Sequence, residues 1–444
     1  MLNPEVENRI RQINPWLVNP QKASVFAERY MPEIYIDRRI EETPSRPNRA
    51  LLIVGPRQAG KSTMVWHRLL AQAPNLLLLN MEDPLIRTGC SDPVNLVEYI
   101  RARINFIKVI FIDEIQHMDE AGLFVKGIVD ARLNLPLYVT GSSAFDLRSK
   151  TKESLAGRAS RRQLMPFDMR EILKHIDPPN PLSEKHACNQ IISHQLVFGS
   201  YPSVYLSPET DEKVLLLSDL LEALILRDAS DLFKIKRVDA FRKLLFLMAG
   251  QIGNLVNLSE IASICQVDVG TINAYIEILE ESHVVKKISP FAGGKRREIT
   301  TAPKVYFIDN GIRNQLLNNF STALDLRTDK GQLLENWVFS EIYKSLPFQS
   351  SIRFWRSKSR AEVDFIIDHR GKIHALEVKF SSIKQTKLSR SAWSFIKAYK
   401  PHNFTVLNTS LEYSGFIDGQ KVTFITPPNL PNWLGNILDI SASL

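Results

Sequence analysis

The sequence predicts an α/β chain that begins with a doubly wound parallel sheet, continues through a helical and winged-helix region, and ends in a second α/β domain. Three observations carry this prediction. A glycine-rich loop joins an apolar run to a helical segment, a buried strand ends in two acids, and two strands near the C-terminus bring further acids and a lysine. Apolar strands that alternate with helical segments are typical of a parallel sheet covered on both faces.

The glycine-rich loop, residues 55–63, fits the phosphate-loop pattern G-x-x-x-x-G-K-[ST]. It follows the apolar run 50–54 and precedes a helix expected from Ser62 to Gln72. Loop amides and the helix N-terminus would face the phosphates of ATP, Lys61 would contact the terminal phosphates, and the Ser62 hydroxyl would ligate Mg²⁺. The expected nucleotide contacts are Gly55, Pro56, Arg57, Gln58, Ala59, Gly60, Lys61, Ser62 and Thr63.

A buried strand over 109–112 ends in Asp113 and Glu114, where a parallel sheet opens onto its ligand. We expect Asp113 to hold Mg²⁺ with Ser62, and Glu114 to polarise the attacking water. A buried strand that merely ends in acids at a turn is the alternative.

Another strand, over 137–140, leads into Gly141, Ser142 and Ser143. A hydroxyl at this strand end can sense the terminal phosphate, and Thr140 and Ser142 are alternative candidates for that role. A turn rich in glycine and serine is also ordinary.

A helix-turn-helix pattern covers residues 257–279, with the turn at 266–269. Residues 284–288 and the basic segment 293–297 would form a wing. In DNA-binding proteins the second helix enters the major groove, but here it ends in Glu280 and Glu281, which phosphates would repel. A winged helix that serves as a packing module therefore stays an alternative.

A second group of acids lies on two strands near the C-terminus, 362–367 and 375–380, joined through the turn residues 368–371. Residues two apart on a strand share a face, so Asp364 would converge with Glu377 and Lys379. The expected metal ligands are Asp364 and Glu377, with Glu335 as a further acid from an upstream helix, and Lys379 would orient or stabilise the nucleophile. A surface hairpin with solvated charges would look similar.

A basic run beside Asp364 adds a candidate surface for nucleic acid. It contains Arg353, Arg356, Lys358 and Arg360, with Phe354 and Trp355 between them. The cations would hold a phosphate backbone, and the aromatic rings would stack on an unpaired base.

Composition sets the frame for these sites. The 444 residues are 44% hydrophobic, which is enough for about three domains with their own cores. A net charge of +8 favours a polyanionic partner without requiring one. Three widely spaced cysteines indicate neither a disulfide framework nor a zinc site, and no signal or membrane-spanning run is present. We therefore expect a cytoplasmic protein with no membrane partner.

Breaks in the pattern divide the chain into five expected segments. Prolines at 178, 179 and 181 interrupt the helical pattern and indicate a linker. The segments are a helical arm (1–40), the nucleotide-binding core (41–176), a helical linker or lid (177–235), the winged helix (236–300) and the second α/β domain (301–444).

With these motifs in view, the chain resembles a bacterial and archaeal family of AAA-type ATPases that carry a C-terminal domain of uncharacterised function. The segments that carry the resemblance are 55–62, 111–116, 140–143, 155–158, 304–311 and 335–379. It implies that the C-terminal part has the restriction-endonuclease fold of the PD-(D/E)XK class, whose site is often degraded in this family; this chain retains Glu335, Asp364, Glu377 and Lys379.

The resemblance also implies a role for Arg158, which matches a position where related ATPases present an arginine to the nucleotide of a neighbouring subunit. Arg161 and Arg162 are rivals for that role, and a salt bridge within the subunit is the alternative. An arginine in that role would act only in a homo-oligomer, and the sequence leaves it open whether subunits assemble.

These features together predict an AAA-type ATPase that binds and hydrolyses ATP with Mg²⁺ and acts on duplex or branched DNA of unknown sequence preference. The sequence leaves open whether the C-terminal domain also has metal-dependent nuclease activity. The alternative is a nucleotide-controlled switch in signalling or assembly that neither binds nor cuts DNA.

Overall fold

The computed structural model of the chain describes residues 2–43, 46–142, 155–225, 235–291, 293, 302–347 and 349–439. The chain forms two compact units. Unit 1 comprises Met1–Pro166 with Glu281–His283, and unit 2 comprises Phe167–Glu280 with Val284–Leu444.

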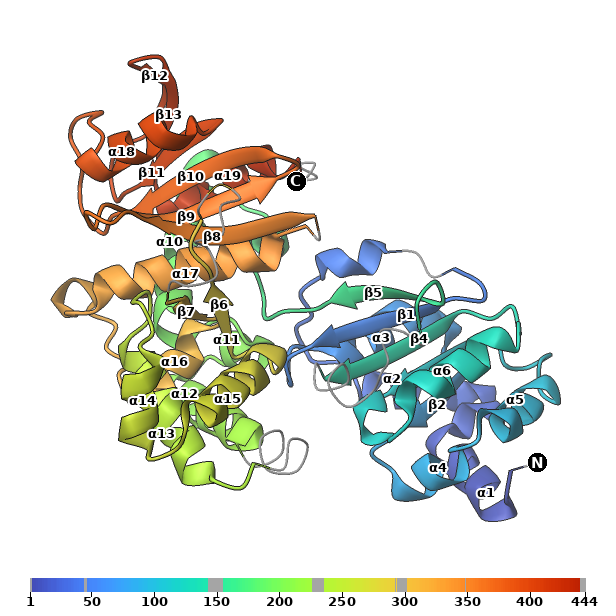
Figure 1. The fold of residues 1–444 in the computed structure, drawn as a ribbon. Coiled ribbons are helices and arrows are strands. Elements are labelled where there is room, and N and C mark those ends of the chain that lie inside the picture. The colour runs from blue at the N-terminus through green and yellow to red at the C-terminus, as the bar shows by residue number, and fades with distance from the viewer. Residues whose placement is uncertain are drawn as a thin grey trace. The chain divides into compact units, whose positions relative to one another are not determined.

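Unit 1 is built on a five-stranded sheet of order β2-β3-β4-β1-β5, in which every neighbouring pair is parallel (Figure 1). Its strands are β1 (Ala50–Gly55), β2 (Leu76–Asn80), β3 (Val109–Asp113), β4 (Leu137–Ser142) and β5 (Ala159–Gln163). Because all strands run in one direction, their carboxyl ends share one edge of the sheet. The register pairs Gly55 with Ser142 and Asn80 with Asp113, so the loop and the acid lie at that edge. The predicted α/β class is confirmed.

Helices cover both faces of this sheet. They are α1 (Pro4–Ile13), α2 (Ala23–Glu28), α3 (Lys61–Leu69), α4 (Pro84–Gly89), α5 (Pro93–Arg101) and α6 (Ala121–Asp130). Alternate strand residues enter two separate apolar clusters, as the twofold period of a strand requires. Ile110 and Ile112 of β3 pack with residues of α1, α4, α5 and α6, whereas Val109 and Phe111 pack with α3.

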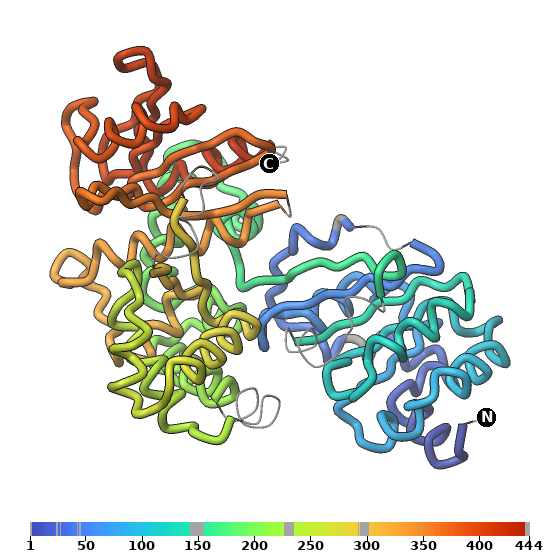
Figure 2. Tube along the Cα trace, in the orientation of Figure 1, coloured from blue at the N-terminus to red at the C-terminus, as the bar shows by residue number. Residues whose placement is uncertain are grey.

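The N-terminal residues, predicted as a separate arm, pack into this same core (Figure 2). The side chain of Asn14 exchanges hydrogen bonds with the backbone of Leu78 in β2, at 2.7 and 2.9 Å. Trp16 donates to the carbonyl of Leu76 and meets Trp66 of α3 edge to face at 5.9 Å. Tyr30 stacks on Trp66 with ring centroids 4.5 Å apart. This aromatic cluster of Trp16, Tyr30 and Trp66 ties the N-terminal residues to the helix that follows the phosphate loop.

Unit 2 begins with helices and a small antiparallel sheet. The helices are α9 (Met169–Ile176), α10 (Pro181–Phe198), α11 (Pro202–Leu206), α12 (Thr210–Ala223), α13 (Val238–Gly250), α14 (Leu258–Cys265), α15 (Val269–Glu281) and α16 (Asn310–Leu316). The strands β6 (Val285–Ile288) and β7 (Lys304–Phe307) pair antiparallel, so this hairpin spans the domain boundary expected at residue 300. Unit 2 also starts at Phe167 and includes α9, ten residues before the boundary expected at 176. Residues 294–297 of the expected wing lie outside the described residues.

Asp309 lies in the segment 304–311, one of the segments that carry the family resemblance, and its contacts explain that segment structurally. Its side chain caps α16 by accepting from the amides of Gly311 and Ile312, and it accepts from both the amide and the hydroxyl of Ser200. Gly199 lies so close that an added Cβ would be 1.9 Å from the Asp309 carboxylate. This segment therefore joins α10 to α16, which requires no catalytic role.

The C-terminal part of unit 2 holds a mixed six-stranded sheet of order β12-β13-β11-β10-β9-β8. Its elements are α17 (Lys330–Ser345), β8 (Ser350–Arg356), β9 (Glu362–His369), β10 (Lys372–Val378), α18 (Arg390–Tyr399), β11 (Asn403–Leu407), β12 (Tyr413–Ile417), β13 (Gln420–Ile425) and α19 (Leu430–Ile437). β8, β9 and β10 are antiparallel, and β11 returns parallel to β10 after α18. The predicted hairpin of the two acid-bearing strands is thus present as β9 and β10.

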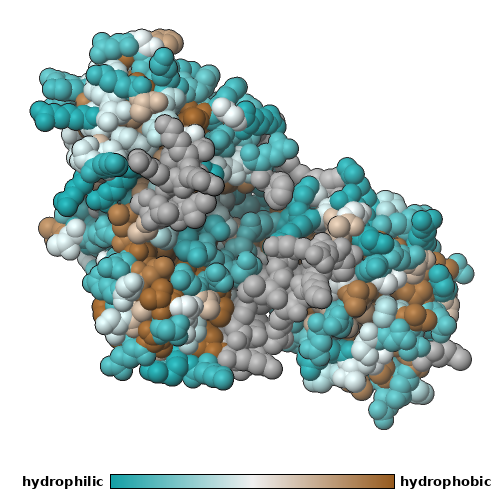
Figure 3. Space-filling model, in the orientation of Figure 1, coloured by the Kyte–Doolittle hydropathy of each residue, from teal (hydrophilic) through white to brown (hydrophobic). Residues whose placement is uncertain are grey.

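The visible surface differs between these parts of unit 2. Figure 3 shows apolar side chains in patches over the helical part, whereas the C-terminal sheet domain is mostly hydrophilic on this face. Within the described ranges, no helix has both the length and the apolar character needed to cross a bilayer.

Candidate functional site

The phosphate loop leaves β1 at Gly55 and enters α3 at Lys61. Gly55 cannot carry a side chain, because an added Cβ would lie 2.0 Å from the carbonyl oxygen of Leu164. Gly60 has φ of 88°, in the left-handed region that favours glycine. The ammonium of Lys61 is buried and donates to the carbonyls of Gly55 and Pro56 at 3.2 and 2.8 Å. The loop therefore holds its lysine in place through its own backbone.

Arg38 supports the loop from the N-terminal segment, and the sequence alone gave no signal for it. Its buried guanidinium donates to the carbonyl of Ala59 at 2.8 Å and also to the carbonyl of Met165. One side chain thus links the phosphate loop to the segment after β5.

Asp113 lies at the end of β3 among hydroxyl groups. The Ser62 hydroxyl donates to its Oδ1 at 2.7 Å, and the Thr140 hydroxyl and the Glu114 amide donate to the same oxygen. Burial, and then the charge of Glu114, raise the pKa of Asp113 to about 6, against the opposing effect of these hydrogen bonds and of Lys61. Ser62 and Asp113 are therefore adjacent, as binding of one divalent cation by both requires.

Glu114 is held in a left-handed backbone conformation with φ of 54°. Its carboxylate accepts a hydrogen bond from the side-chain NH₂ group of Gln116. The side-chain Oε1 of Gln116 in turn accepts from the backbone amide of Ser142 at 2.9 Å. Gln116 is nearly inaccessible to solvent and so connects Glu114 with the end of β4. Sequence reasoning missed this role of Gln116, because its partner lies on a strand 26 residues away.

The two sensor candidates on β4 have different environments. The Thr140 hydroxyl contacts Asp113, whereas the buried Ser142 hydroxyl has no hydrogen-bond partner among the described residues. Ser143 lies outside those residues.

Arg158 forms an ion pair with Asp130 of its own subunit, with Nε 2.7 Å from the carboxylate. Both side chains are partly exposed, at 37% and 45%, and a pair at the surface of this kind contributes little to stability. The alternative of an internal salt bridge is therefore what the structure shows for this subunit.

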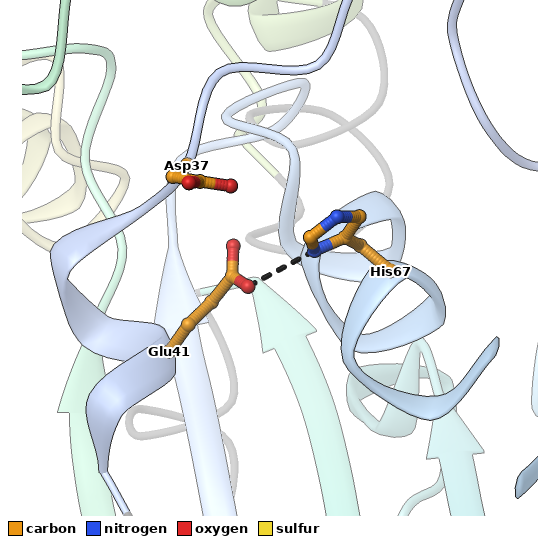
Figure 4. A group of neighbouring side chains, drawn as sticks. All are labelled: Asp37, Glu41 and His67. Carbon is orange, nitrogen blue, oxygen red and sulfur yellow. Dashed lines mark hydrogen bonds and ion pairs between the residues drawn. The ribbon is translucent and has the colours of Figure 1, made fainter. Parts of the chain in front are cut away.

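A further polar group lies where the N-terminal segment meets α3 (Figure 4). Ligand atoms of Asp37, Glu41 and His67 lie within 4.8 Å of one another, which is close enough for a metal ion. Glu41 already contacts His67 at 3.0 Å and also accepts from the Tyr35 hydroxyl and the Arg38 amide. These contacts explain the group as a structural link to α3.

The C-terminal acid cluster, defined here as Glu335, Glu362, Asp364 and Glu377, lies on α17, β9 and β10. Phe365 pairs with Leu376, so Asp364 and Glu377 occupy the next opposed positions on the two strands. Asp364 accepts from the amide of Val378 at 2.8 Å. Burial, and then the charge of Glu335, raise its pKa to about 8.

The outer part of this cluster faces a pocket of about 560 Å³. Glu377 contacts the ammonium of Lys379 at 2.7 Å and accepts from the Ser389 hydroxyl at 3.1 Å. The pocket lining includes Glu377, Lys379, Ser382, Lys384, Lys387 and Ser389. Lysines and hydroxyls beside a carboxylate suit a phosphate group near a cation.

The inner part of the cluster contains a lysine that sequence reasoning missed. The ammonium of Lys304, from β7, lies 2.5 Å from Glu362 and 3.6 Å from Glu335, and the Tyr306 hydroxyl donates to Glu335 at 2.6 Å. Burial raises the pKa of Glu335, although the charge of Lys304 opposes this. In the described part of the chain, the ligand atoms of Glu335, Asp364 and Glu377 do not gather within 4.8 Å. The expected three-acid metal site is therefore not assembled in this conformation.

The basic run beside Asp364 is only partly available to a ligand. Phe354 and Trp355 are 0% and 6% exposed, so the prediction that their rings stack on an unpaired base is wrong. Arg356 forms an ion pair with Glu362 at 3.3 Å.

The strand order, the phosphate loop and the acids at the sheet edge are those of a phosphate-loop nucleotide-binding domain. Residues 47–173 match the family described as an AAA domain. Residues 189–323 and 330–427 each match a domain of unknown function, DUF8612 and DUF4143.

Relatives extend over most of the chain. An uncharacterized protein of Methanocaldococcus jannaschii is 24% identical over 364 residues, which cover 80% of this chain and 79% of the relative. An uncharacterized protein of Haemophilus influenzae is 25% identical over 391 residues, which cover 84% and 92%. An uncharacterized protein of Mycobacterium tuberculosis is 24% identical over 356 residues, which cover 78% and 75%.

Similar solved structures include the replication initiator DnaA bound to AMPPCP and single-stranded DNA, with a TM-score of 0.27 and 12% identity over 57% of this chain and 92% of that one. Cdc6p from Pyrobaculum aerophilum has a TM-score of 0.25 and 12% identity over 71% and 94%. Likeness at this level carries no further argument.

Proposed function

We propose that the chain is an ATP-hydrolysing enzyme that acts on DNA. The observation that supports ATP hydrolysis is the contact between Ser62 of the phosphate loop and Asp113, 2.7 Å apart at the carboxyl edge of the sheet. A hydroxyl and a carboxylate placed together beyond such a loop suit Mg²⁺ bound to nucleotide phosphates.

Each residue at this edge has a proposed role. The loop amides and Lys61 bind the phosphates, Ser62 and Asp113 hold Mg²⁺, and Glu114 orients the attacking water. Bound Mg²⁺ would neutralise charge on the transferring phosphate. The residue that reports on the terminal phosphate is either Thr140, through its contact with Asp113, or Ser142, through Gln116.

Three features support DNA as the partner. The chain carries a net charge of +8. Helices α13, α14 and α15 and the antiparallel pair β6–β7 follow one another in the order of elements typical of a winged helix. Lys379, Lys384 and Lys387 line the pocket beside Glu377, where a phosphate backbone would find complementary charge.

The proposal includes assembly of several copies. Arg158 is accessible at the surface, and its weak ion pair with Asp130 leaves it free to exchange partners. In an oligomer it would approach the nucleotide of a neighbouring subunit, where an arginine stabilises the transition state.

A second candidate function is metal-dependent cleavage of phosphodiesters in the C-terminal domain. The order α17, β8, β9, β10, α18, β11 brings Asp364 and Glu377 to opposed positions, with Lys379 one residue beyond β10. Two carboxylates and a lysine beside a basic pocket have the groups that this chemistry requires.

The competing function is a nucleotide-controlled switch in signalling or assembly. In that case the three helices and the hairpin would act as a packing module, and ATP would change conformational populations without any DNA affinity.

The test is ATP turnover with single-stranded, duplex and branched DNA, with Mg²⁺ or Mn²⁺, while the DNA is followed on a gel. Lys61→Ala should abolish turnover but leave DNA binding intact. DNA that binds with a steep salt dependence and raises turnover supports the proposal. Cleavage by the wild type that is lost in Asp364→Ala supports the second candidate. Turnover without any DNA affinity would replace the proposal with the switch.

A further inference from the structure

Lys304 is an unusual residue for a strand that belongs to a small helical domain. Its side chain is 2% exposed, although an isolated ammonium is costly to bury. β7 pairs with β6, and Lys304 also bridges to Leu255, so the backbone fixes the position of this residue. The ammonium points into the C-terminal acid cluster, which comes from different elements of unit 2.

The surroundings of Lys304 resemble those of a bound cation. Its ammonium contacts Glu362 at 2.5 Å and Glu335 at 3.6 Å, and it lies 5.5 Å from the centre of the buried Phe354 ring. Burial by itself would lower the pKa of Lys304, but the charges of Glu335, Asp364 and Glu362 raise it, so the side chain stays charged. The carboxylates thus act as its ligands.

We propose that Lys304 is the built-in cation of the C-terminal acid cluster and keeps the cluster free of divalent metal. Two observations lead to this. Glu335, a predicted metal ligand, already forms an ion pair with Lys304 and accepts a hydrogen bond from Tyr306. A divalent ion between Asp364 and Glu377 would also lie near a fixed, buried positive charge, which repels it strongly in a medium of low dielectric constant.

Lys379 provides a matched control for this role of Lys304. Lys379 is the other lysine of the cluster, but its side chain is 46% exposed and contacts the outer acid, Glu377. An exposed lysine can swing away when a metal arrives, whereas Lys304 is fixed by β7. Removal of Lys304 should therefore open the cluster to metal, and removal of Lys379 should not.

The test is a Mn²⁺ titration of the full chain without nucleotide, followed by electron paramagnetic resonance. The wild type and Asp364→Asn should bind Mn²⁺ alike. Lys304→Met should gain a site that binds roughly tenfold or more tightly and disappears in Lys304→Met with Asp364→Asn. Lys379→Met should behave like the wild type.

Mn²⁺ should also raise the unfolding temperature of Lys304→Met. In the wild type, Mn²⁺ should change the unfolding temperature only as much as it does in Asp364→Asn. If Lys304→Met does not fold, the double variant Lys304→Met with Glu335→Gln removes one charge of each sign and should gain the same site. Asp364-dependent Mn²⁺ binding by the wild type would overturn the proposal. So would folded Lys304 variants that gain no Mn²⁺ site. Neither result depends on whether the chain hydrolyses ATP, whereas metal-dependent cleavage of DNA that is lost in Asp364→Asn would also count against the proposal.

Discussion

The two acidic sites of this chain lie at strand ends of two α/β sheets, but they neutralise their carboxylates in different ways. Asp113 is surrounded by hydroxyls and an amide, and the described residues offer it hydrogen bonds without a salt bridge. The C-terminal acid cluster contacts Lys304, Lys379 and Arg356 directly. Hydroxyls can share a carboxylate with a metal ion, whereas a fixed ammonium competes with it. On our proposals, the first site would bind a metal ion, whereas the second carries its own cation.

The largest effect expected from this comparison concerns folding stability. Lys304→Met should destabilise unit 2 by about 3–5 kcal/mol, because it leaves buried carboxylates without their cation. Lys379→Met should cost less than about 1 kcal/mol, because its ion pair is half exposed. Denaturant unfolding measured by circular dichroism distinguishes them. Equal losses for both lysines would show that burial of Lys304 has no special importance.

The next effect concerns catalysis at the first site. Asp113→Asn preserves the shape of the side chain but removes the charge that would hold Mg²⁺. ATP turnover should fall on the order of 10²- to 10³-fold. A coupled assay for ADP measures it, with Asp364→Asn as the control that keeps wild-type turnover. A similar loss in both variants would contradict the separation of the two sites.

The charge of Asp113 also predicts a pH dependence of stability in the metal-free chain. Its folded pKa of about 6 lies above the ordinary value of 3.8, so the folded state binds the proton more tightly. Stability should therefore fall as pH rises from about 4 to about 6, by at most about 3 kcal/mol.

Asp113→Asn should lack this loss and be more stable than the wild type at pH 7. Thermal unfolding across pH 4 to 8 in EDTA, without nucleotide, measures the difference. Parallel pH profiles for the wild type and the variant would show that burial and the charge of Glu114 do not raise the pKa of Asp113 in the folded state.

A smaller effect is expected from the residue that orients Glu114. Gln116→Ala removes the amide that contacts the Glu114 carboxylate. We expect kcat for ATP to fall roughly 10- to 100-fold, because the base loses its orientation. KM for ATP should stay within about twofold, since Gln116 is nearly inaccessible to solvent. Gln116→Glu repels Glu114 and should show at least the same loss; wild-type kcat in both variants would exclude the role.

The smallest expected effect on stability belongs to Arg158. Arg158→Ala should leave the unfolding temperature unchanged, because its pair with Asp130 is exposed. If Arg158 acts across subunits, its loss lowers turnover, and mixing Arg158→Ala with Lys61→Ala restores part of it. Asp130→Ala is the control that frees Arg158. No recovery in the mixture would restrict Arg158 to its internal ion pair.

Features that depend on local pattern were predictable from the sequence. The phosphate loop, the strand that ends in Asp113 and the β9–β10 hairpin each lie within a short segment whose periodicity or residue types indicate them. Lys304 was not predictable, because its partner Glu362 is 58 residues away and only packing of β7 against the C-terminal sheet brings them together. The burial of Phe354 and Trp355 was missed for the same reason, since the bulge in β8 places both in contact with the interior.

The aromatic cluster of Trp16, Tyr30 and Trp66 gives the phosphate loop an optical reporter. Trp66 lies on α3, the helix that begins with Lys61, and its ring contacts Trp16 and Tyr30 at centroid distances of 5.9 and 4.5 Å. Indole emission responds to the immediate surroundings of the ring, so a shift of α3 on nucleotide binding would change its intensity. The other tryptophans, Trp337, Trp355, Trp393 and Trp433, all belong to unit 2. A chain in which those four are replaced by phenylalanine would therefore report occupancy of the phosphate loop from its own fluorescence.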